Sequence, residues 1–175
     1  MTTPPAKSAP PERLDPPMDA DERTQLTMFL DYLRASVVWK CSGLTDEQAR
    51  RRLVPSELTT ISGLLGHLAL VENWWFRVVL DGQPDEWAEA LAQDPDAEFR
   101  VALTTPIEQL IAGYEAEVAL SREIVAAREF TDTVRYKDRE DLNVRWVVTH
   151  LIEETARHLG HLDLLRELTD GLTGE

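Results

Sequence analysis

Two residues of types that bind divalent metals stand four positions apart in the last long apolar pattern of the chain. At about 100° per residue, Glu154 and His158 fall on the same helical face as Val147, Leu151 and Leu162. An unpaired carboxylate on such an apolar face would cost several kcal/mol to bury. Glu154 therefore needs a cation, a strong hydrogen-bond donor, or a position at the edge of the core that water can reach.

A third candidate ligand, His67, lies in the middle of an earlier apolar helical pattern. One carboxylate and two imidazoles are a ligand set that zinc uses in catalytic sites, where a fourth position stays open. The spacing of Glu154 and His158 alone is not specific, because charged pairs four residues apart also stabilise exposed helices. For His67 the alternative is a core histidine whose ring nitrogen is hydrogen bonded to a carbonyl group.

Four more residues near the last apolar pattern could take part in chemistry. His150 and His161 flank Glu154 and are candidates for catalytic proton transfer, or for replacing a metal ligand. Alternatively, both are rim residues hydrogen bonded to neighbouring helices. Arg157 and Arg166 are candidates for holding an anionic ligand or cofactor beside the metal, although pairing with acidic residues one turn away explains them equally well.

The composition excludes some kinds of site and some kinds of partner. Cys41 is the single cysteine, which excludes an internal disulfide and a cysteine-based zinc site. We expect Cys41 to act as a small buried hydrophobic residue and not as a nucleophile. Acidic residues outnumber basic ones 32 to 18 and the formal charge is −14, so nucleic acid is not an expected partner. No apolar run approaches the roughly 18 residues that cross a bilayer. We therefore expect a soluble cytoplasmic protein without a membrane partner.

The candidate residues must be positioned by long amphipathic helices. Apolar residues recur at three and four positions in four segments, at about residues 19–41, 60–80, 105–127 and 143–170. Side chains that can cap a helix precede three of them, namely Asp19, Thr105 and Asn143. The last helix is expected to stop at Gly171.

The connections between these helices differ in length and character. Residues 82–104 mix prolines and acidic residues with brief apolar pieces, which predicts a long crossover with one helical turn near Trp87–Leu91. Thr45 and Gln48 have the spacing of a capping box that opens a short connecting turn. Residues 128–141 read as a polar loop, and no alternating stretch predicts a strand.

The chain is therefore expected to form one domain after a short tail. Residues 1–18 hold six of the ten prolines and little apolar material, so we expect them to be disordered or loosely docked. Residues 19–175 are expected to form an all-α domain, a four-helix bundle with a long crossover between the second and third helices. Sites in such bundles are built from side chains that project inward from facing helices.

Two segments, His67–Phe76 and His150–Glu167, resemble the DinB-like superfamily, most closely the metal-binding domain of the mycothiol-dependent maleylpyruvate isomerase branch. The resemblance extends over residues 19–171. It implies a divalent metal, commonly zinc or nickel, held by one histidine of the second helix and two residues of the fourth. The matching residues are His67, Glu154 and His158, a set similar to the His/Glu/His ligands of that branch, whereas many members carry His at the position of Glu154.

Two interpretations of function follow. The first is a metal-dependent enzyme, a thiol-dependent S-transferase or isomerase in which a metal with an open position activates mycothiol or another low-molecular-weight thiol toward a small-molecule substrate. The second is a non-catalytic bundle, metal-binding or metal-free, that acts as a stress-related interaction protein or a homodimer. An enzyme should have a titratable group within reach of the open metal position, and His161 or His150 is the candidate.

Overall fold

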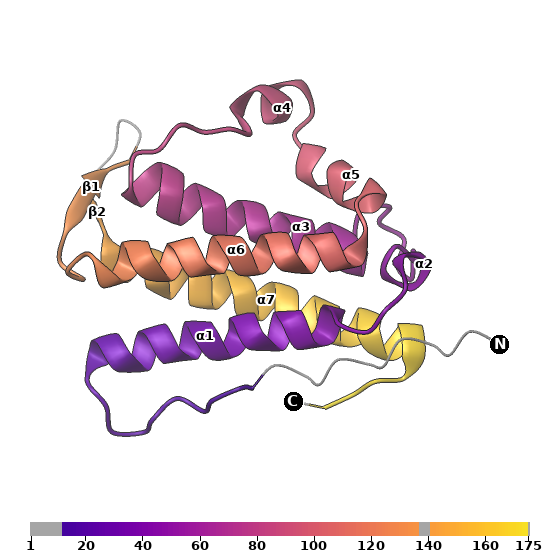
Figure 1. Cartoon of the computed structure of the whole chain (residues 1–175), viewed down its shortest axis with the longest axis horizontal. Coiled ribbons are helices and arrows are strands. Elements are labelled where there is room, and N and C mark those ends of the chain that lie inside the picture. Colours follow the sequence, from indigo (N-terminus) through magenta and orange to yellow (C-terminus); the bar gives the residue numbers. More distant parts are fainter. Residues whose placement is uncertain (1–11, 137–140, 175) are drawn as a thin grey trace.

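The computed structural model describes residues 12–136 and 141–174, and its architecture is a bundle of four long helical elements (Figure 1). These elements run side by side along the long axis of the molecule. They are α1 (Glu22–Cys41), α3 (Ile61–Glu72) with its direct continuation η1 (Asn73–Leu80), α6 (Ile107–Ala126) and α7 (Val144–Asp170). The all-α four-helix bundle expected from the sequence is confirmed.

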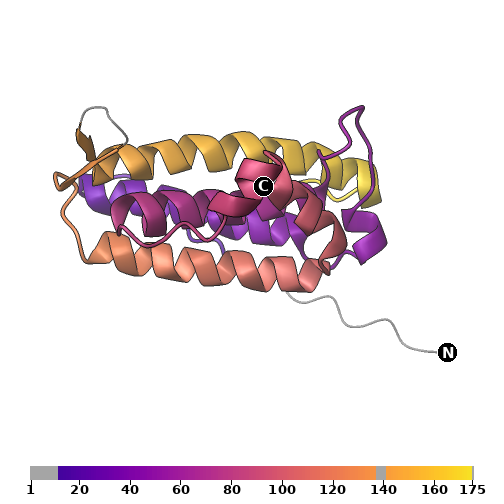
Figure 2. The ribbon, with the colours of Figure 1, turned by 90° about the horizontal axis from the view of Figure 1, so that it is seen from above.

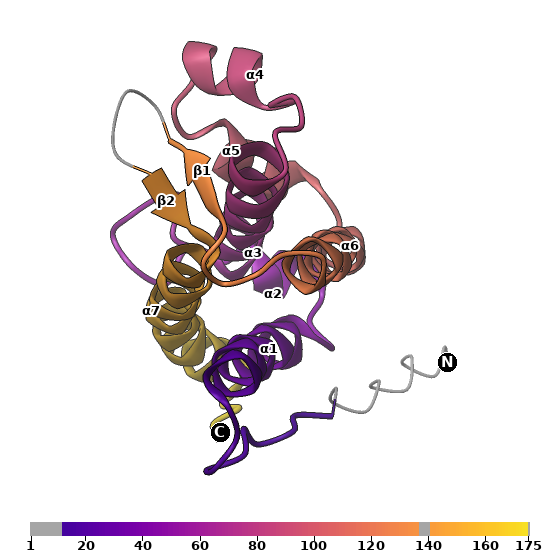
Figure 3. The same ribbon diagram turned by 90° about the vertical axis from the view of Figure 1, so that its left-hand side faces the viewer.

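The long helices do not pair in sequence order. Seen end on, α1, α7, α3 and α6 follow one another around the bundle (Figure 3). The first long helix packs mainly on the last one, and α3 packs on α6 and on the crossover. Two groups of buried apolar side chains fill the interior, one around Leu65 and Leu162 and the other around Phe76 and Leu151. Burial of each such side chain contributes about 1.5–3 kcal/mol, so the stripe predicted on the last helix is a main source of stability.

Side-chain caps fix where most of the helices begin. Asn143 caps α7 by accepting a 2.8 Å hydrogen bond from the backbone N–H three residues on, and Thr45 and Gln48 form the expected capping box. The predicted cap of α1 was wrong by two positions. Asp21, not Asp19, accepts the first-turn N–H, because it directly precedes the helical residues.

The start of α6 is capped from a distant part of the chain. The sequence predicted Thr105 as its N-cap, but the Thr105 hydroxyl donates to the Val101 carbonyl instead. The first helical N–H, that of Ile107, donates to Asp46 Oδ1 at 2.8 Å. Asp46 opens the short helix α2 (Asp46–Ala49), so this contact ties the connector after α1 to the third long helix.

The crossover between the second and third long helices is more helical than expected. It contains α4 (Ala88–Gln93) and α5 (Ala97–Thr104), and it covers part of α3 when seen from above (Figure 2). The predicted turn at Trp87–Leu91 is the beginning of α4. A Cβ at Gly66 would lie 2.6 Å from the Cβ of Ala102, so the absence of a side chain at Gly66 allows α5 to approach α3 this closely.

The second long helix changes type in its middle. The α-helical part ends at Glu72, and η1 continues the same rod as a π-helix. The wider turn changes which residues face inward, because Phe76 and Leu80 are buried whereas Trp74 and Trp75 are only partly covered. α-Helical periodicity would place both tryptophans in the same apolar sector as His67, but that periodicity does not hold here.

A small hairpin replaces part of the predicted polar loop. β1 (Thr133–Arg135) pairs antiparallel with β2 (Asp141–Asn143), with Val134 opposite Leu142. The expectation of no strand was therefore wrong, because three-residue strands are too short to show alternation in the sequence. Residues 137–140 of the predicted loop lie outside the described residues.

The predicted tail is described only in its second part, since residues 1–11 lie outside the described residues. Within residues 12–18, the Arg13 guanidinium lies 4.2 Å from the centre of the Trp39 ring of α1. This part of the chain therefore contacts the bundle through a cation–π interaction. Among the described residues, no helix is long and apolar enough to cross a bilayer.

Candidate metal centre

The three predicted metal ligands converge between α3 and α7. One ligand atom from each of His67, Glu154 and His158, called the triad below, lies within 4.8 Å of the other two. Glu154 Oε1 is 3.4 Å from His67 Nε2 and 3.0 Å from His158 Nε2. The triad is half-buried, because its side chains expose 14–22 % of their surface. The expectation that the three side chains face a common point is therefore met by the geometry.

The separations between Glu154 and the two histidines suit a tetrahedral first-row ion. With bonds of about 2.0 to 2.1 Å, two ligands of a tetrahedral ion lie about 3.4 Å apart. The observed 3.4 Å fits, and the 3.0 Å separation requires an opening of only a few tenths of an ångström. Three ligands would leave a fourth position open to a small molecule, which is the arrangement of catalytic zinc.

The surroundings also favour the protonation states that ligands need. Burial raises the pKa of Glu154, but His158, the hydrogen bond from His67 and the Arg157 guanidinium outweigh it and hold that pKa below its ordinary value. Burial lowers the pKa of His158, and the neighbouring His67 lowers it further, against the opposing effect of Glu154. An ionised carboxylate and an unprotonated imidazole are the forms that bind metal.

A fourth residue, Glu98 of α5, completes the surroundings of the triad. Its Oε1 lies 3.1 Å from His67 Nδ1, and only 5 % of the residue is exposed. A proton on Nδ1 that is donated to Glu98 leaves the Nε2 lone pair facing Glu154. In this neutral form two acceptors face each other across 3.4 Å, so a metal cation between them would take the place of the hydrogen bond that a protonated Nε2 donates to Glu154. A carboxylate behind a ligating histidine is the usual support of a metal site.

Sequence reasoning missed Glu98 for a physical reason. It belongs to an acidic stretch that was read as part of the crossover, and its partner His67 lies 31 positions away. No local spacing connects the two residues, because their contact depends on how α5 packs over α3. The only available signal was a carboxylate among the brief apolar pieces of the crossover.

Comparison with protein families agrees with this arrangement. The family model described as Mycothiol-S-transferase matches residues 25–171, a range that contains the whole triad. The chain belongs to this family. The match also confirms the DinB-like resemblance. Comparison with curated proteins and with solved structures gives no match.

In this mycothiol S-transferase family member, the two arginines that were predicted to lie beside a metal lie in different places. Arg157 is next to the triad, where it donates to Glu154 Oε2 at 3.1 Å and also contacts Glu153. Arg166 follows His158 by eight positions, about 12 Å along the helix. It is 2 % exposed and donates to the carbonyls of Lys40 and Ser42 and to Asp170. This placement makes Arg166 a structural link between α1 and α7 and does not support a role in holding a ligand.

The two predicted catalytic histidines of this family member also differ in position. The exposed His161 ring contacts the His158 ring edge-on at 5.6 Å between centroids, so it borders the triad. His150 stacks on Trp146 at 5.0 Å and meets the Trp75 ring edge-on at 4.9 Å. His150 therefore belongs to an aromatic cluster one helical turn before Glu154. Its Nδ1 lies 3.6 Å from Oε2 of Glu153, and none of its described contacts is with a triad residue itself.

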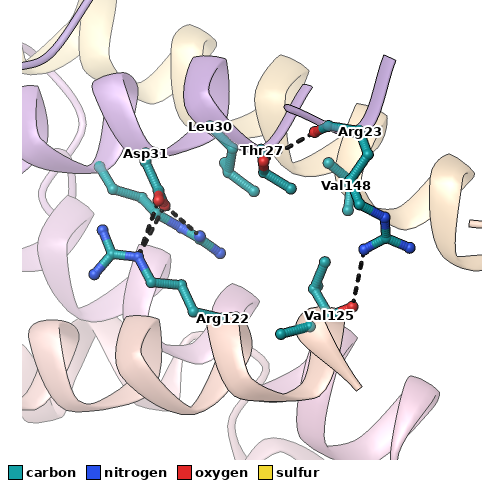
Figure 4. A pocket seen from close by; sticks show the side chains of 9 residues that line it. Arg23, Thr27, Leu30, Asp31, Arg122, Val125 and Val148 are labelled. Atoms are coloured by element: carbon teal, nitrogen blue, oxygen red, sulfur yellow. Dashed lines mark hydrogen bonds and ion pairs between the residues drawn. The ribbon is translucent and has the colours of Figure 1, made fainter. Parts of the chain in front are cut away.

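Two further features of this mycothiol S-transferase family member lie away from the triad. Cys41 is completely buried, and burial raises the pKa of its thiol to about 12, which agrees with the expected inert residue. A cavity of about 340 Å³ opens between α1 and α6, on the opposite side of the bundle (Figure 4). Its guanidinium groups are engaged, because Arg122 pairs with Asp31 and Arg23 donates to the Val125 carbonyl.

Proposed function

We propose that this chain is a metal-dependent S-transferase that joins a low-molecular-weight thiol of the mycothiol type to a small electrophilic substrate. The observation that carries the proposal is the convergence of the triad within a chain that matches the mycothiol S-transferase family. This match favours transfer over the isomerisation that the sequence resemblance also allowed. Zinc suits the two imidazoles and one carboxylate, and nickel is the second candidate.

The proposed chemistry assigns a role to each group of the site. When bound, a divalent ion supplies Lewis acidity that lowers the pKa of a thiol toward neutrality. The Glu98 carboxylate orients His67, and the Arg157 guanidinium holds Glu154. His161, exposed beside His158, is positioned to accept the proton that the thiol loses. The thiol must come from outside the chain, because Cys41 is buried.

In this proposal, the aromatic cluster beside the triad contacts the substrate. Trp146 is 48 % exposed and contacts the rings of Trp75 and His150, and His150 lies about 6 Å along α7 from Glu154. His150 then lines the substrate site and does not transfer a proton. All three triad residues come from one chain, so a homodimer is not required to assemble the proposed ligand set.

Metal affinity tests the ligand assignment with a matched pair of variants. Glu154→Gln removes a charged ligand, and Glu153→Gln changes its exposed neighbour, which contacts Arg157 but lies outside the triad. We expect Glu154→Gln to weaken zinc binding by at least tenfold and Glu153→Gln to have a small effect, in a competition titration against a chromophoric chelator. Equal affinities for the two variants would remove Glu154 from the ligand set.

A cobalt-substituted protein tests the thiol part of the proposal separately. Addition of mycothiol is expected to produce a sulfur-to-metal charge-transfer band in the ultraviolet, and His158→Ala should abolish that band. A protein that binds cobalt through the triad but shows no spectral change at saturating thiol would support the non-catalytic metal-binding bundle. Product formation from mycothiol and a small electrophile then decides whether thiol binding leads to transfer.

A further inference from the structure

A second cavity lies under the crossover, between α3, α5 and α6, and it has a volume of about 180 Å³. Glu98 lines it, so the residue that contacts His67 through one oxygen also belongs to this cavity. Glu117 of α6 and Trp87, which directly precedes α4, line it as well. The cavity is separate from the larger one between α1 and α6.

Two carboxylate oxygens at this cavity lack partners. Glu98 Oε2 and Glu117 Oε2 are buried, and neither has a hydrogen-bond partner among the described residues. Glu98 is itself 95 % covered, since 5 % of it is exposed. A buried acceptor without a donor is costly, and native proteins nearly always satisfy such atoms with protein, water or ligand.

The charges around the cavity leave a deficit of positive groups. Glu117 has an ion pair with Arg77, at 3.1 Å from Nη1 to Oε1. Within the described part of the chain, Glu98 has no ion-pair contact with lysine or arginine, and its partner is His67. A donor that carries positive charge would satisfy both free oxygens and compensate Glu98, whereas an anion would be repelled by both carboxylates.

The walls of the cavity indicate the rest of the ligand. Leu70 and Val101 offer apolar surface, Asn73 offers a side-chain amide, and the Trp87 ring can face a cation. The volume suits a group of a few heavy atoms. The formal charge of −14 also raises the local concentration of cations at the surface of this protein.

We propose that this cavity binds a small primary ammonium ion with a short apolar chain, whose N–H groups are held by Glu98 and Glu117. The three donors of an ammonium group match the two free carboxylate oxygens and the amide of Asn73. The apolar chain of the ligand lies against Leu70 and Val101. The site shares Glu98 with the support of His67, but the proposal requires neither a bound metal nor transfer activity.

The test uses n-butylammonium as the probe and 1-butanol as its uncharged counterpart, both titrated into the full chain and followed by calorimetry. We expect saturable binding of n-butylammonium and at least tenfold weaker binding of 1-butanol. Glu117→Gln should weaken n-butylammonium binding about tenfold or more. The matched control is Glu115→Gln, because Glu115 is an exposed carboxylate on the same helix that does not line the cavity.

Three results would overturn the proposal. They are the absence of saturable n-butylammonium binding, equal binding of n-butylammonium and 1-butanol, and equal effects of Glu117→Gln and Glu115→Gln. Equal effects of the two variants would show that only the overall charge attracts n-butylammonium. The absence of saturable binding would show that water, and not an ammonium ion, hydrogen bonds to the free oxygens. If Glu117→Gln does not fold, the wild-type protein still decides, because the Trp87 indole N–H resonance must shift on binding and must not shift with 1-butanol.

Discussion

At the scale of single residues, the candidate centre depends on a carboxylate behind one of its histidines. Glu98 Oε1 contacts His67 Nδ1 at 3.1 Å, whereas Nδ1 of His158 is buried without a hydrogen-bond partner among the described residues. The two histidines are therefore supported unequally. Rotation of the His67 ring is restricted by a hydrogen bond, and that of His158 is restricted only by packing and by its contact with Glu154.

Replacement of the supporting carboxylate should weaken metal binding without removing a ligand. We expect Glu98→Gln to lower zinc affinity by about 10- to 100-fold, because the ring of His67 loses a charged acceptor that fixes its tautomer. A chelator competition titration measures this change, and Glu89→Gln, an exposed carboxylate of the neighbouring helix α4, serves as the control. Unchanged affinity in Glu98→Gln would mean that packing alone orients His67.

The lowered pKa of His158 predicts a dependence of stability on pH in the metal-free protein. The unfolded chain binds this proton near the ordinary value of 6.5, and the native state binds it only at lower pH. Protonation therefore favours unfolding as pH falls from 6.5 toward the native pKa, and the free energy of unfolding decreases in that window. The lowered pKa of Glu154 adds a further loss below 4.5.

Urea denaturation of wild type and His158→Gln at about pH 7.5 and about pH 5.5 measures the contribution of His158. The wild type is expected to lose more stability between the two conditions than the variant, because the variant cannot take up this proton. Parallel losses in the two proteins would contradict a depressed pKa at His158.

At the scale of elements, the start of α6 depends on a residue that lies far away in the sequence. Asp46 Oδ1 accepts the Ile107 N–H, and the cap residue Pro106 supplies no side-chain hydrogen bond. This contact fixes the end of the crossover, and therefore the position of α5 over α3. An N-cap of this kind also places a negative charge at the positive end of the helix dipole.

Loss of this distant cap should destabilise the bundle by an amount typical of a local one. We expect Asp46→Ala to lower the free energy of unfolding by about 1 kcal/mol in urea denaturation. Glu47→Ala is the matched control, since Glu47 is an exposed acidic residue of the same short helix. A comparable loss in the control would point to the helix dipole of α2 and not to the contact with α6.

The elements divide clearly into those that local sequence predicts and those that it does not. The four long helices follow from periodicity, and Asn143 and Thr45 cap as expected because a cap and its target lie three residues apart. The support of His67 by Glu98 is set by packing between distant segments, and the π-helical turn after Glu72 is not predicted by apolar periodicity. The triad itself was predictable because two of its members share one helical face.

At the scale of the whole molecule, a buried ion pair joins α1 to α3 through the core. Arg34 donates from Nε and Nη2 to both oxygens of Glu72, each at 2.7 Å, and both side chains are at least 95 % covered. The pair lies where α3 becomes η1. α1 and α3 lie diagonally opposite each other in the bundle, and the two charges compensate each other only while these helices keep this arrangement. The ion pair therefore couples the position of α1 to that of the second long helix.

Breaking this pair should cost far more than removing it entirely. We expect Arg34→Met to lower the free energy of unfolding by about 3–5 kcal/mol, because Glu72 would be left as an uncompensated buried charge. The double change of Arg34→Met with Glu72→Leu should recover much of this loss in the same urea experiment. A double variant as unstable as the sum of the two single variants would show that the charges are not coupled.

The contact between the first and last helices also orders events during synthesis. Until α7 has been synthesised, the apolar face of α1 lacks its main packing partner, because α1 contacts α3 and α6 much less than it contacts α7. The nascent chain carries His67 and Glu98 long before it carries Glu154 and His158. The triad is therefore complete only after α7 has been synthesised, so a chain that lacks α7 is not expected to bind a metal at this site.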